Sequence, residues 1–234
     1  MAGALSSLYD HLKKAPVPAG RPFVTLAYAQ TLDGSIAAVP GRPTQVSGRA
    51  SMEMAHRLRA LHDGILVGIG TVLADDPQLT VRHVAGANPQ PVILDSSLRT
   101  PANAHLMRTK PAPWIAHHNG GSAAGQALER AGATLLALPP APSIGLDLTA
   151  VLAELRSRGV RRLMVEGGSA IIRSFLRDHL VDTLVLTIAP RILGGLRPLA
   201  DSEPVGGLPQ LTDPAWVPLD PDVVVWSPTE WSAA

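Results

Sequence analysis

The stretch RRLMVEGGSAIIRSFLRDHLVDTLVLTIA, residues 161–189, carries the pattern that decides the fold of this chain. Apolar runs predict strands over Arg162–Glu166 and Thr183–Ala189, and helical spacing predicts a helix over Ser169–Asp178 between them. A helix that connects two consecutive strands forms a crossover connection, so the two strands are expected to lie parallel in one sheet.

The same alternation of strands and helices extends in both directions from this unit. Helices are predicted at Ala4–Lys14, Arg49–Leu61, Ser122–Ala131 and Leu148–Arg158. Strands are predicted at Phe23–Ala29, Ile65–Gly68, Pro91–Asp95, Trp114–Ala116, Thr134–Leu138, Trp216–Leu219 and Val223–Trp226. The last two strands are joined too tightly for a helix and should pair antiparallel. The predicted fold is α/β, with a mainly parallel mixed sheet between two layers of helices (a three-layer α/β/α arrangement).

A Pro/Gly-rich linker separates the first predicted helix from the rest of the chain. We therefore expect residues 1–20 to form an N-terminal extension and residues 21–234 to form a single domain. The N-terminus lacks the basic start and apolar core of a secretory signal, and no run approaches the ~18 apolar residues that a membrane span needs. A cytoplasmic location is the simplest expectation.

Composition limits the chemistry. The chain has 20 basic and 19 acidic residues, so its net charge gives no reason to expect nucleic acid or an anionic membrane as a partner. Aromatic residues make up only 3% of the chain, which leaves little surface for stacking bases. Without cysteine, disulfides, thiolate metal sites and cysteine nucleophiles are excluded. The histidines show no metal-ligand spacing, so no metal site is predicted.

The first candidate ligand site is EGGSAIIRSFL, residues 166–176. The strand ends at Glu166, Gly167 and Gly168 follow, and Ser169 is placed to cap the next helix. Glycines let a ligand approach the backbone, and free amides at a helix N-terminus favour a phosphate. A tight strand-to-helix turn without any ligand explains the glycines equally well.

A second turn of the same kind lies in GILVGIGTVLADDPQLTVR, residues 64–82. Gly68 and Gly70 lead into a short helix for which Thr71 is the expected cap. Leu73 takes the place of the third glycine of the dinucleotide fingerprint, so the usual dinucleotide-binding fold is poorly supported. Asp75 and the following aspartate are either solvated turn residues or acceptors for ribose and amide groups of a ligand.

Two arginines and a third strand end complete the set of candidates. Arg59 and Arg82 flank the second turn and could together clamp a phosphate. In VILDSSLR, residues 92–99, Asp95 would accept from an adenine ribose and favour NAD. Ser96, Ser97 and Arg99 would instead suit a 2′-phosphate. The residues alone leave this choice open.

Together these segments resemble the reductase domain of bacterial riboflavin biosynthesis, in the dihydrofolate-reductase-like superfamily. RPFVTLAYAQTLDGSIA, HRLRALHDGILVGIGTVLADDPQLTVR, VILDS, LMVEGGSAIIRSFL and LVDTLVLTIAPRILGG occur in the order of that family and cover about residues 21–195. The resemblance implies a homodimer that uses NADPH. It also implies reduction of a ribosylamino group to ribitylamino in 5-amino-6-(5-phosphoribosylamino)uracil or the related diaminopyrimidine.

The resemblance also assigns roles to residues of this chain. Arg59, Leu79, Arg82 and Glu166 would contact the substrate, with the arginines on its phosphate and Glu166 as the best candidate for a catalytic acid. The cofactor would be contacted by Ala29, Thr71, Asp75, Ser96 and the turn around Gly167, Gly168, Ser169, Ala170 and Ile171, which extends to Ser174.

Some residues depart from the family pattern. Thr31 stands where the family commonly has serine, and Pro43 and Gln45 replace a small polar residue and an aromatic. The cysteine-dependent zinc deaminase domain has no counterpart in this sequence, so we expect a separate deaminase protein. Two alternatives stay open: a reductase of a pterin such as dihydrofolate or of another carbonyl or imine, and a non-catalytic nucleotide-binding module.

Overall fold

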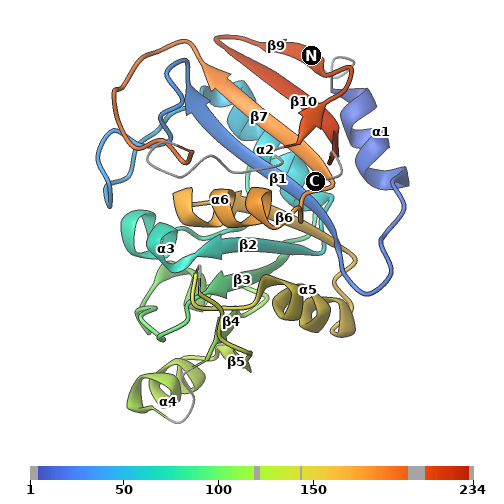
Figure 1. Cartoon of the computed structure of the whole chain (residues 1–234). Coiled ribbons are helices and arrows are strands. Elements are labelled where there is room, and N and C mark those ends of the chain that lie inside the picture. The colour runs from blue at the N-terminus through green and yellow to red at the C-terminus, as the bar shows by residue number, and fades with distance from the viewer. Residues whose placement is uncertain (1–4, 119–121, 143, 200–208, 232–234) are drawn as a thin grey trace.

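The structure, a computed structural model of the chain, describes residues 5–118, 122–142, 144–199 and 209–231. The strands within these ranges are β1 (Phe23–Thr31), β2 (Gly64–Gly68), β3 (Gln90–Leu94), β4 (Trp114–His117), β5 (Thr134–Ala137), β6 (Arg162–Gly167), β7 (Thr183–Ala189), β8 (Gln210–Leu211), β9 (Ala215–Leu219) and β10 (Asp222–Glu230). They form one sheet in the order β5-β4-β3-β2-β6-β1-β7-β10-β8, and β9 pairs with β10 (Figure 1).

The sheet is parallel from β5 to β7 and antiparallel from there on. The strands from β5 to β7 all run in one direction, and β10 pairs antiparallel with both β7 and β9. The expected mainly parallel sheet with an antiparallel C-terminal pair is therefore confirmed.

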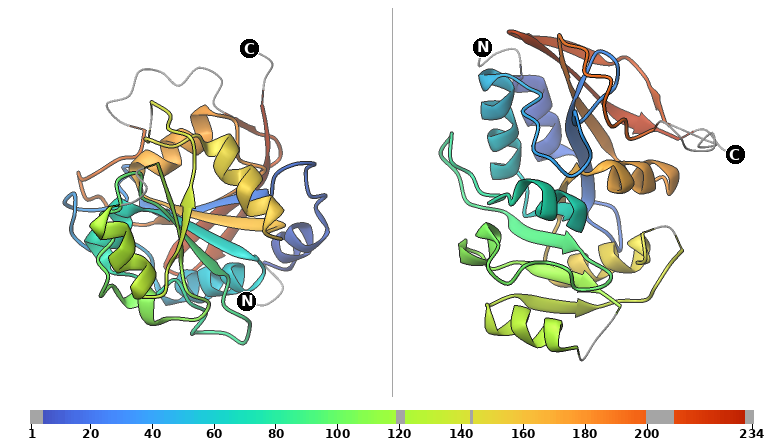
Figure 2. Two further views of the ribbon diagram at one scale, coloured as in Figure 1. Left: turned by 90° about the horizontal axis from the view of Figure 1, so that it is seen from below. Right: turned by 90° about the vertical axis from the view of Figure 1, so that its left-hand side faces the viewer.

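Helices cover both faces of the sheet. They are α1 (Ser6–Lys14), α2 (Arg49–Ala60), α3 (Ile69–Asp75), α4 (Ala123–Arg130), α5 (Leu148–Ser157), α6 (Ser169–Arg177) and the short 3₁₀ helix η1 (His105–Arg108). Apolar side chains of α5 and α6 pack on one face, and those of α1, α2, α3 and α4 pack on the other (Figures 1 and 2). This arrangement gives the three layers that the sequence predicts.

The central strands are apolar on both sides because both faces are covered. In β1, Val24 and Leu26 contact the layer of α5 and α6, whereas Phe23 and Ala27 contact the layer of α1 and α2. The Val24 and Leu26 side chains are fully buried. Continuous apolar runs in β1, β2 and β6 therefore reflect burial on two sides rather than one.

Helix α1 packs directly on the sheet. Its Leu8 and Leu12 are fully buried in the same cluster as Phe23 of β1. Nη2 of Arg162 donates to the carbonyl oxygens of Lys13 and Ala15 at 2.9 and 2.7 Å, which satisfies acceptors at the C-terminus of the helix.

Two expected helix caps are wrong. Both α3 and α6 follow a glycine, Gly68 and Gly168, and neither helix start has a side-chain cap hydrogen bond. Thr71 lies inside α3, and Ser169 is the first residue of α6, so neither occupies the cap position. Gly168 has a φ of 90°, a left-handed conformation that favours glycine there over serine. The sequence also did not predict η1 and β8.

Candidate functional site

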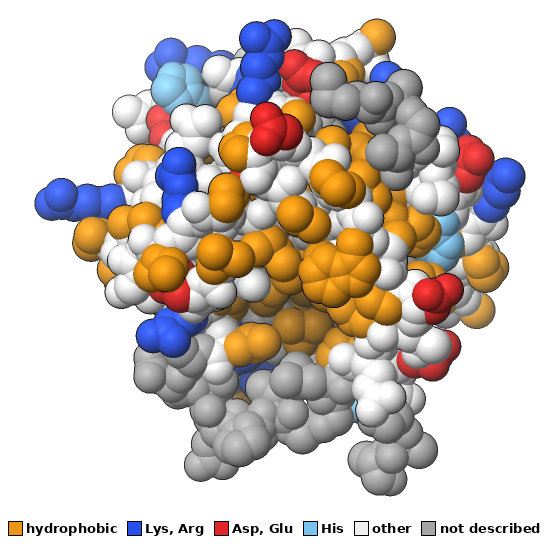
Figure 3. Space-filling model, turned by 90° about the horizontal axis from the view of Figure 1, so that it is seen from above, with side chains coloured by type: hydrophobic (Ala, Val, Ile, Leu, Met, Phe, Trp, Pro, Cys, Tyr) orange, Lys and Arg blue, Asp and Glu red, His pale blue; other side chains and the backbone are white. Residues whose placement is uncertain are grey.

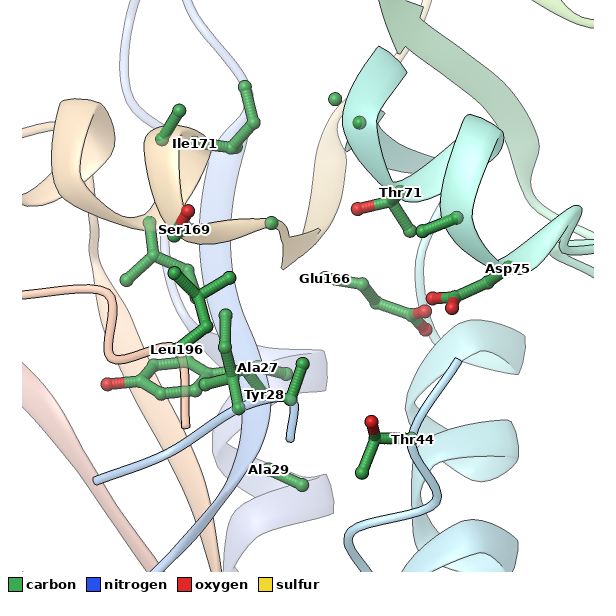
Figure 4. Close-up of a pocket in the computed structure, with 18 of the residues that line it drawn as sticks. Ala27, Tyr28, Ala29, Thr44, Thr71, Asp75, Glu166, Ser169, Ile171 and Leu196 are labelled. Carbon is green, nitrogen blue, oxygen red and sulfur yellow. The ribbon is translucent and has the colours of Figure 1, made fainter. Parts of the chain in front are cut away.

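A cleft of about 710 Å³ opens at the carboxyl ends of the central parallel strands, where ligands commonly bind in open α/β sheets. Ala29 of β1, Glu166 of β6 and Thr187 of β7 line it, together with residues at the start of α3 and α6. Figure 4 looks into this cleft. Glu166 points away from Tyr28 and toward the side on which Thr71 and Asp75 lie.

The two glycine turns, about one hundred residues apart in the chain, lie against each other. The hydroxyl of Thr71 donates to the carbonyl oxygen of Gly167 at 3.3 Å. A Cβ added at Gly168 would lie 3.0 Å from Oγ1 of Thr71, and one added at Gly68 would lie 2.8 Å from Cγ1 of Ile171. Gly68 and Gly168 are therefore required for the close packing of the two turns, whether or not a ligand binds there.

Glu166 sits at an irregularity of the sheet. Leu66 of β2 is paired with Val165, but Val67 is paired with Gly167, so Glu166 is the extra residue of a bulge. Bulges commonly re-aim a side chain beside a functional site. Here the bulge places Glu166 in the cleft, on the side of the sheet covered by α2.

Arg59 of α2 holds the carboxylate of Glu166 in a bidentate pair. Its Nε and Nη2 donate to the two carboxylate oxygens at 2.6 and 2.8 Å, and its Nη1 donates to the carbonyl oxygen of Thr80 at 3.0 Å. Burial disfavours the charge of Arg59, but the charge and hydrogen bonds of Glu166 outweigh burial and raise the pKa of Arg59. The pair fixes the orientation of Glu166.

Arg82, in the loop after α3, contacts the same threonine as Arg59. Its Nη1 donates to the hydroxyl of Thr80 at 2.7 Å, so Arg59 and Arg82 share this threonine. Burial, followed by the positive charges of Arg59 and Arg82, lowers the pKa of His56 to about 4. Nδ1 of His56 accepts a hydrogen bond from the backbone N–H of Arg82 at 2.9 Å, as a neutral ring can.

The structure separates the predicted site residues into two groups. Arg59, Glu166, Ala29, Thr71, Asp75, Gly168, Ser169, Ala170 and Ile171 all line the cleft. Arg82, Leu79, Ser96 and Gly167 do not. Leu79 is buried in an apolar cluster, and its φ of 56° places it in the left-handed region. Asp76 has a structural role, because its Oδ1 accepts from the backbone N–H of His105 at 2.8 Å.

Several polar residues that line the cleft were not predicted from the sequence. Tyr28 and Thr187 come from the ends of β1 and β7, and Thr44, Ser47 and Ser51 come from the loop before α2 and its first turn. Burial raises the pKa of Tyr28 to about 12. Position at the carboxyl end of a parallel strand was the available signal for Tyr28 and Thr187. The loop residues carry no comparable signal.

Asp33 joins two loops at one rim of the cleft. Its carboxylate accepts hydrogen bonds from the hydroxyls of Thr31 and Ser35 and from the backbone N–H groups of Leu193 and Gly194. The bonds from Thr31 and Ser35 are the main reason why the pKa of Asp33 lies well below its usual range. The Asp33-Gly34 turn, part of the segment that resembles the reductase family, thus joins the loops after β1 and β7 by hydrogen bonds.

Within the described ranges, no three His, Asp or Glu side chains gather closely enough to hold a metal ion. None of the helices in those ranges is both long and apolar enough to cross a membrane.

Comparison with known proteins identifies the relatives of this chain. Residues 22–225 match the family model described as the RibD C-terminal domain. A 2,5-diamino-6-ribosylamino-4(3H)-pyrimidinone 5′-phosphate reductase of Methanothermobacter thermautotrophicus is 38% identical over 82% of this chain and 88% of its own length. The riboflavin biosynthesis protein RibD of Aquifex aeolicus is 37% identical over 74% of this chain, but the match spans only 48% of that longer protein.

A solved structure shows the same fold. The riboflavin biosynthesis reductase Rib7 of Saccharomyces cerevisiae superposes with a TM-score of 0.76 at 26% identity, over 97% of this chain and 98% of that one. The expected dihydrofolate-reductase-like fold is confirmed.

Proposed function

Because this chain belongs to the RibD C-terminal domain family, we propose that it is an NADPH-dependent reductase of a ribosylamino-pyrimidine 5′-phosphate. Its substrate would be 5-amino-6-(5-phosphoribosylamino)uracil or the related diaminopyrimidine, and its product the ribitylamino compound. The observation that carries the proposal is the meeting of both glycine turns with the Arg59–Glu166 pair at one cleft.

The cleft fits a reduced nicotinamide dinucleotide. Reductases of this family use a nicotinamide cofactor, and NADPH is the form that we propose. Gly168 and Thr71, which pack against each other where the two turns meet, both line the cleft. Thr71, Asp75, Ser169, Ala170 and Ile171 would hold the cofactor, with Ala29 and Ser96 nearer its two ends. The cofactor supplies the hydride that the reaction requires.

On the substrate side, Arg59 and Arg82 carry the positive charge. Nε and Nη2 of Arg82 form no hydrogen bond to the described residues, so these donors remain for a phosphate. Arg59 already commits three of its N–H groups to Glu166 and Thr80, so it contributes fewer donors than Arg82. Leu79 is buried in an apolar cluster, so it would support the loop that carries Arg82 rather than touch the substrate.

Glu166 would orient the sugar beside the cofactor. Both of its oxygens accept from Arg59, the arrangement of an ionised carboxylate, so the structure favours a positioning role over that of a proton donor. The remaining task of the protein is to hold two ligands together and to exclude water from the cleft.

The test compares substrates and one variant. The purified chain should oxidise NADPH with the phosphorylated pyrimidine, turn over poorly without the phosphate, and leave dihydrofolate unreduced. Arg82→Ala should raise KM for the phosphorylated substrate about 10- to 100-fold, because a charged hydrogen-bond donor is lost. Arg130→Ala, an exposed arginine of α4, serves as the control and should not change KM.

Three results would contradict the proposal. Reduction of dihydrofolate in preference to the pyrimidine would support the pterin alternative. Tight NADPH binding with no turnover on any substrate of the panel would support a non-catalytic module. An unchanged KM in Arg82→Ala would remove the arginine from the phosphate site.

The proposal extends to organisation and partners. Residues 21–234 would form one reductase domain to which the helix of the N-terminal extension, α1, is attached. We also propose a homodimer that acts in the cytoplasm, with deamination carried out by a separate protein.

A further inference from the structure

Arg82 lies in a stretch of chain that has no regular secondary structure. Residues 76–82 follow α3 and pair with none of the strands that the structure describes. Backbone N–H and C=O groups in such a stretch take partners other than those of helices and sheets. Side chains supply them at three consecutive residues. Arg59 donates to the carbonyl oxygen of Thr80 at 3.0 Å, Asn88 accepts from the N–H of Val81 at 2.8 Å, and His56 accepts from the N–H of Arg82 at 2.9 Å.

Two of these three partners, His56 and Arg59, belong to α2. They are three residues apart, so their side chains lie on the same face of the helix. One accepts from an N–H and the other donates to a carbonyl oxygen, so together they hold the backbone of residues 80–82 at two points. The face of α2 that orients Glu166 therefore also holds the backbone of Arg82.

The hydrogen bond to His56 acts against a repulsion between the two arginines. After burial, the positive charge of Arg59 is the next cause that lowers the pKa of Arg82. Both guanidinium groups bond to Thr80, Arg59 at its carbonyl oxygen and Arg82 at its hydroxyl. Repulsion tends to move Arg82 away from Arg59, and an anchored backbone limits that movement.

A neutral imidazole suits this position. Burial, followed by the charges of the two arginines, lowers the pKa of His56 to about 4, so the ring adds no third positive charge at neutral pH. A carboxylate could accept the same N–H, but it would compete with a phosphate for the arginines. His56 is only 2% exposed, and its ring meets that of His83 edge to face with centroids 4.5 Å apart, which fixes the ring orientation.

We infer that His56 is a positioning residue for the phosphate of the substrate and that it acts through Arg82. The inference rests on the proposed function, which takes Arg82 to bind that phosphate. His56 does not line the cleft, so its effect passes through the backbone N–H that it holds. Without this acceptor, Arg82 would move away from Arg59, and the two guanidinium groups would no longer converge on one phosphate.

The test uses ribose 5-phosphate, which carries the sugar phosphate without the pyrimidine. In calorimetric titrations, His56→Phe should bind it about 10-fold more weakly, because this variant keeps a buried ring but leaves the N–H of Arg82 without its acceptor. His56→Asn should recover most of the affinity, because its Oδ1 can take the place of Nδ1. In steady-state assays, His56→Phe should raise KM for the phosphorylated pyrimidine and leave KM for NADPH unchanged.

Two further proteins separate positioning from a general loss of stability. His62→Phe is the matched control, since it removes another buried histidine with two hydrogen bonds. It should lower the urea midpoint without changing the affinity for ribose 5-phosphate. In the double variant, His56→Phe should add no loss to that of Arg82→Ala, because coupled residues are not additive.

An unchanged affinity in His56→Phe would overturn the inference. Losses that multiply in the double variant would also overturn it, because His56 would then act independently of Arg82. The same loss in His62→Phe would reduce the effect to stability. If His56→Phe does not fold, His56→Gln replaces it, since its oxygen lies one bond farther out and should bind ribose 5-phosphate more weakly than His56→Asn; equal affinities would count against the inference.

The same measurements distinguish this inference from the proposed function. Binding of ribose 5-phosphate without reduction of any pyrimidine would contradict the proposed function, while the titrations would still decide the role of His56. Turnover of the phosphorylated pyrimidine with a KM that His56→Phe does not change would contradict this inference alone. No binding of ribose 5-phosphate to the unchanged protein would overturn the inference as well.

Discussion

At the scale of single residues, His62 shows how burial sets a charge state. The ring is fully buried, its Nδ1 donates to the carbonyl oxygen of Leu58 at 2.7 Å, and its Nε2 accepts from the hydroxyl of Thr25 at 2.8 Å. Burial is the main cause that lowers the pKa of His62 from 6.5 to about 4. The neutral ring joins the last turn of α2 to β1.

This lowered pKa predicts a loss of stability in acid. Between the unfolded pKa of 6.5 and the folded pKa of about 4, the unfolded chain binds the proton and the folded chain does not. The free energy of unfolding should therefore fall as the pH falls through this window, by about 3 kcal/mol in total from this residue. Below the window its contribution should be constant. Urea unfolding at a series of pH values measures the effect.

The control for this prediction is a pair of variants. His62→Gln should be less stable at neutral pH but should lose less stability on acidification than the unchanged protein. His118→Gln, which removes an exposed histidine, should leave the slope unchanged. A His62→Gln protein with the same pH slope as the unchanged chain would show that His62 does not titrate in this way.

At the scale of elements, the start of α2 depends on a residue from the far end of the chain. The carboxylate of Asp222, at the start of β10, accepts from the backbone N–H of Gly48 at 2.7 Å and from the hydroxyl of Ser51 at 2.6 Å. It therefore ties the residue before the helix and a side chain of the first turn to β10, at a helix start where Gly48 supplies no side-chain cap. Since α2 carries Arg59, this contact supports the position of the Arg59–Glu166 pair.

Asp222→Ala should lower the free energy of unfolding by about 2 kcal/mol, because it leaves the buried hydroxyl of Ser51 and the partly buried N–H of Gly48 without this acceptor. It should also raise KM for the pyrimidine substrate, because the start of α2 shifts. Asp222→Asn keeps an acceptor oxygen and should restore most of the stability. Urea midpoints and steady-state rates give the two readings. A midpoint for Asp222→Ala equal to that of the unchanged protein would show that α2 is held by other contacts.

At the scale of the whole molecule, apolar side chains are prominent on one face. Hydrophobic side chains gather on the face seen in Figure 3, the side on which Figure 1 shows β9 and β10. Trp216 of β9 is 63% exposed. Contiguous exposed apolar surface commonly marks a site of association. The proposed homodimer would cover it.

If this apolar surface is the dimer interface, a charge introduced at Trp216 should weaken the dimer. Sedimentation should show a dimer for the unchanged chain and mostly monomer for Trp216→Glu, because a buried charge without a partner opposes association. Leu73→Glu introduces the same charge at an exposed position of α3 and should stay dimeric. A Trp216→Glu protein that remains dimeric would place the interface on another face.

Much of this architecture could be predicted from local patterns. The crossover unit of β6, α6 and β7, the parallel sheet and the antiparallel end all follow from apolar periodicity and loop length, which act over a few residues. Both glycine turns were predicted as well, since strand-to-helix turns have a local signature.

The contacts that build the site were not visible in those patterns. The bulge at Glu166, its pairing with Arg59 across 107 residues, and the contact of Asp222 with the start of α2 all depend on how distant segments meet. The wrong caps at Thr71 and Ser169 have the same origin, because the packing of one turn on the other displaced the local preference. The sequence by itself determined which elements form and in what order, since periodicity is a local property. Only the tertiary structure decided which side chains face the cleft, because that depends on register and burial between segments far apart in the chain.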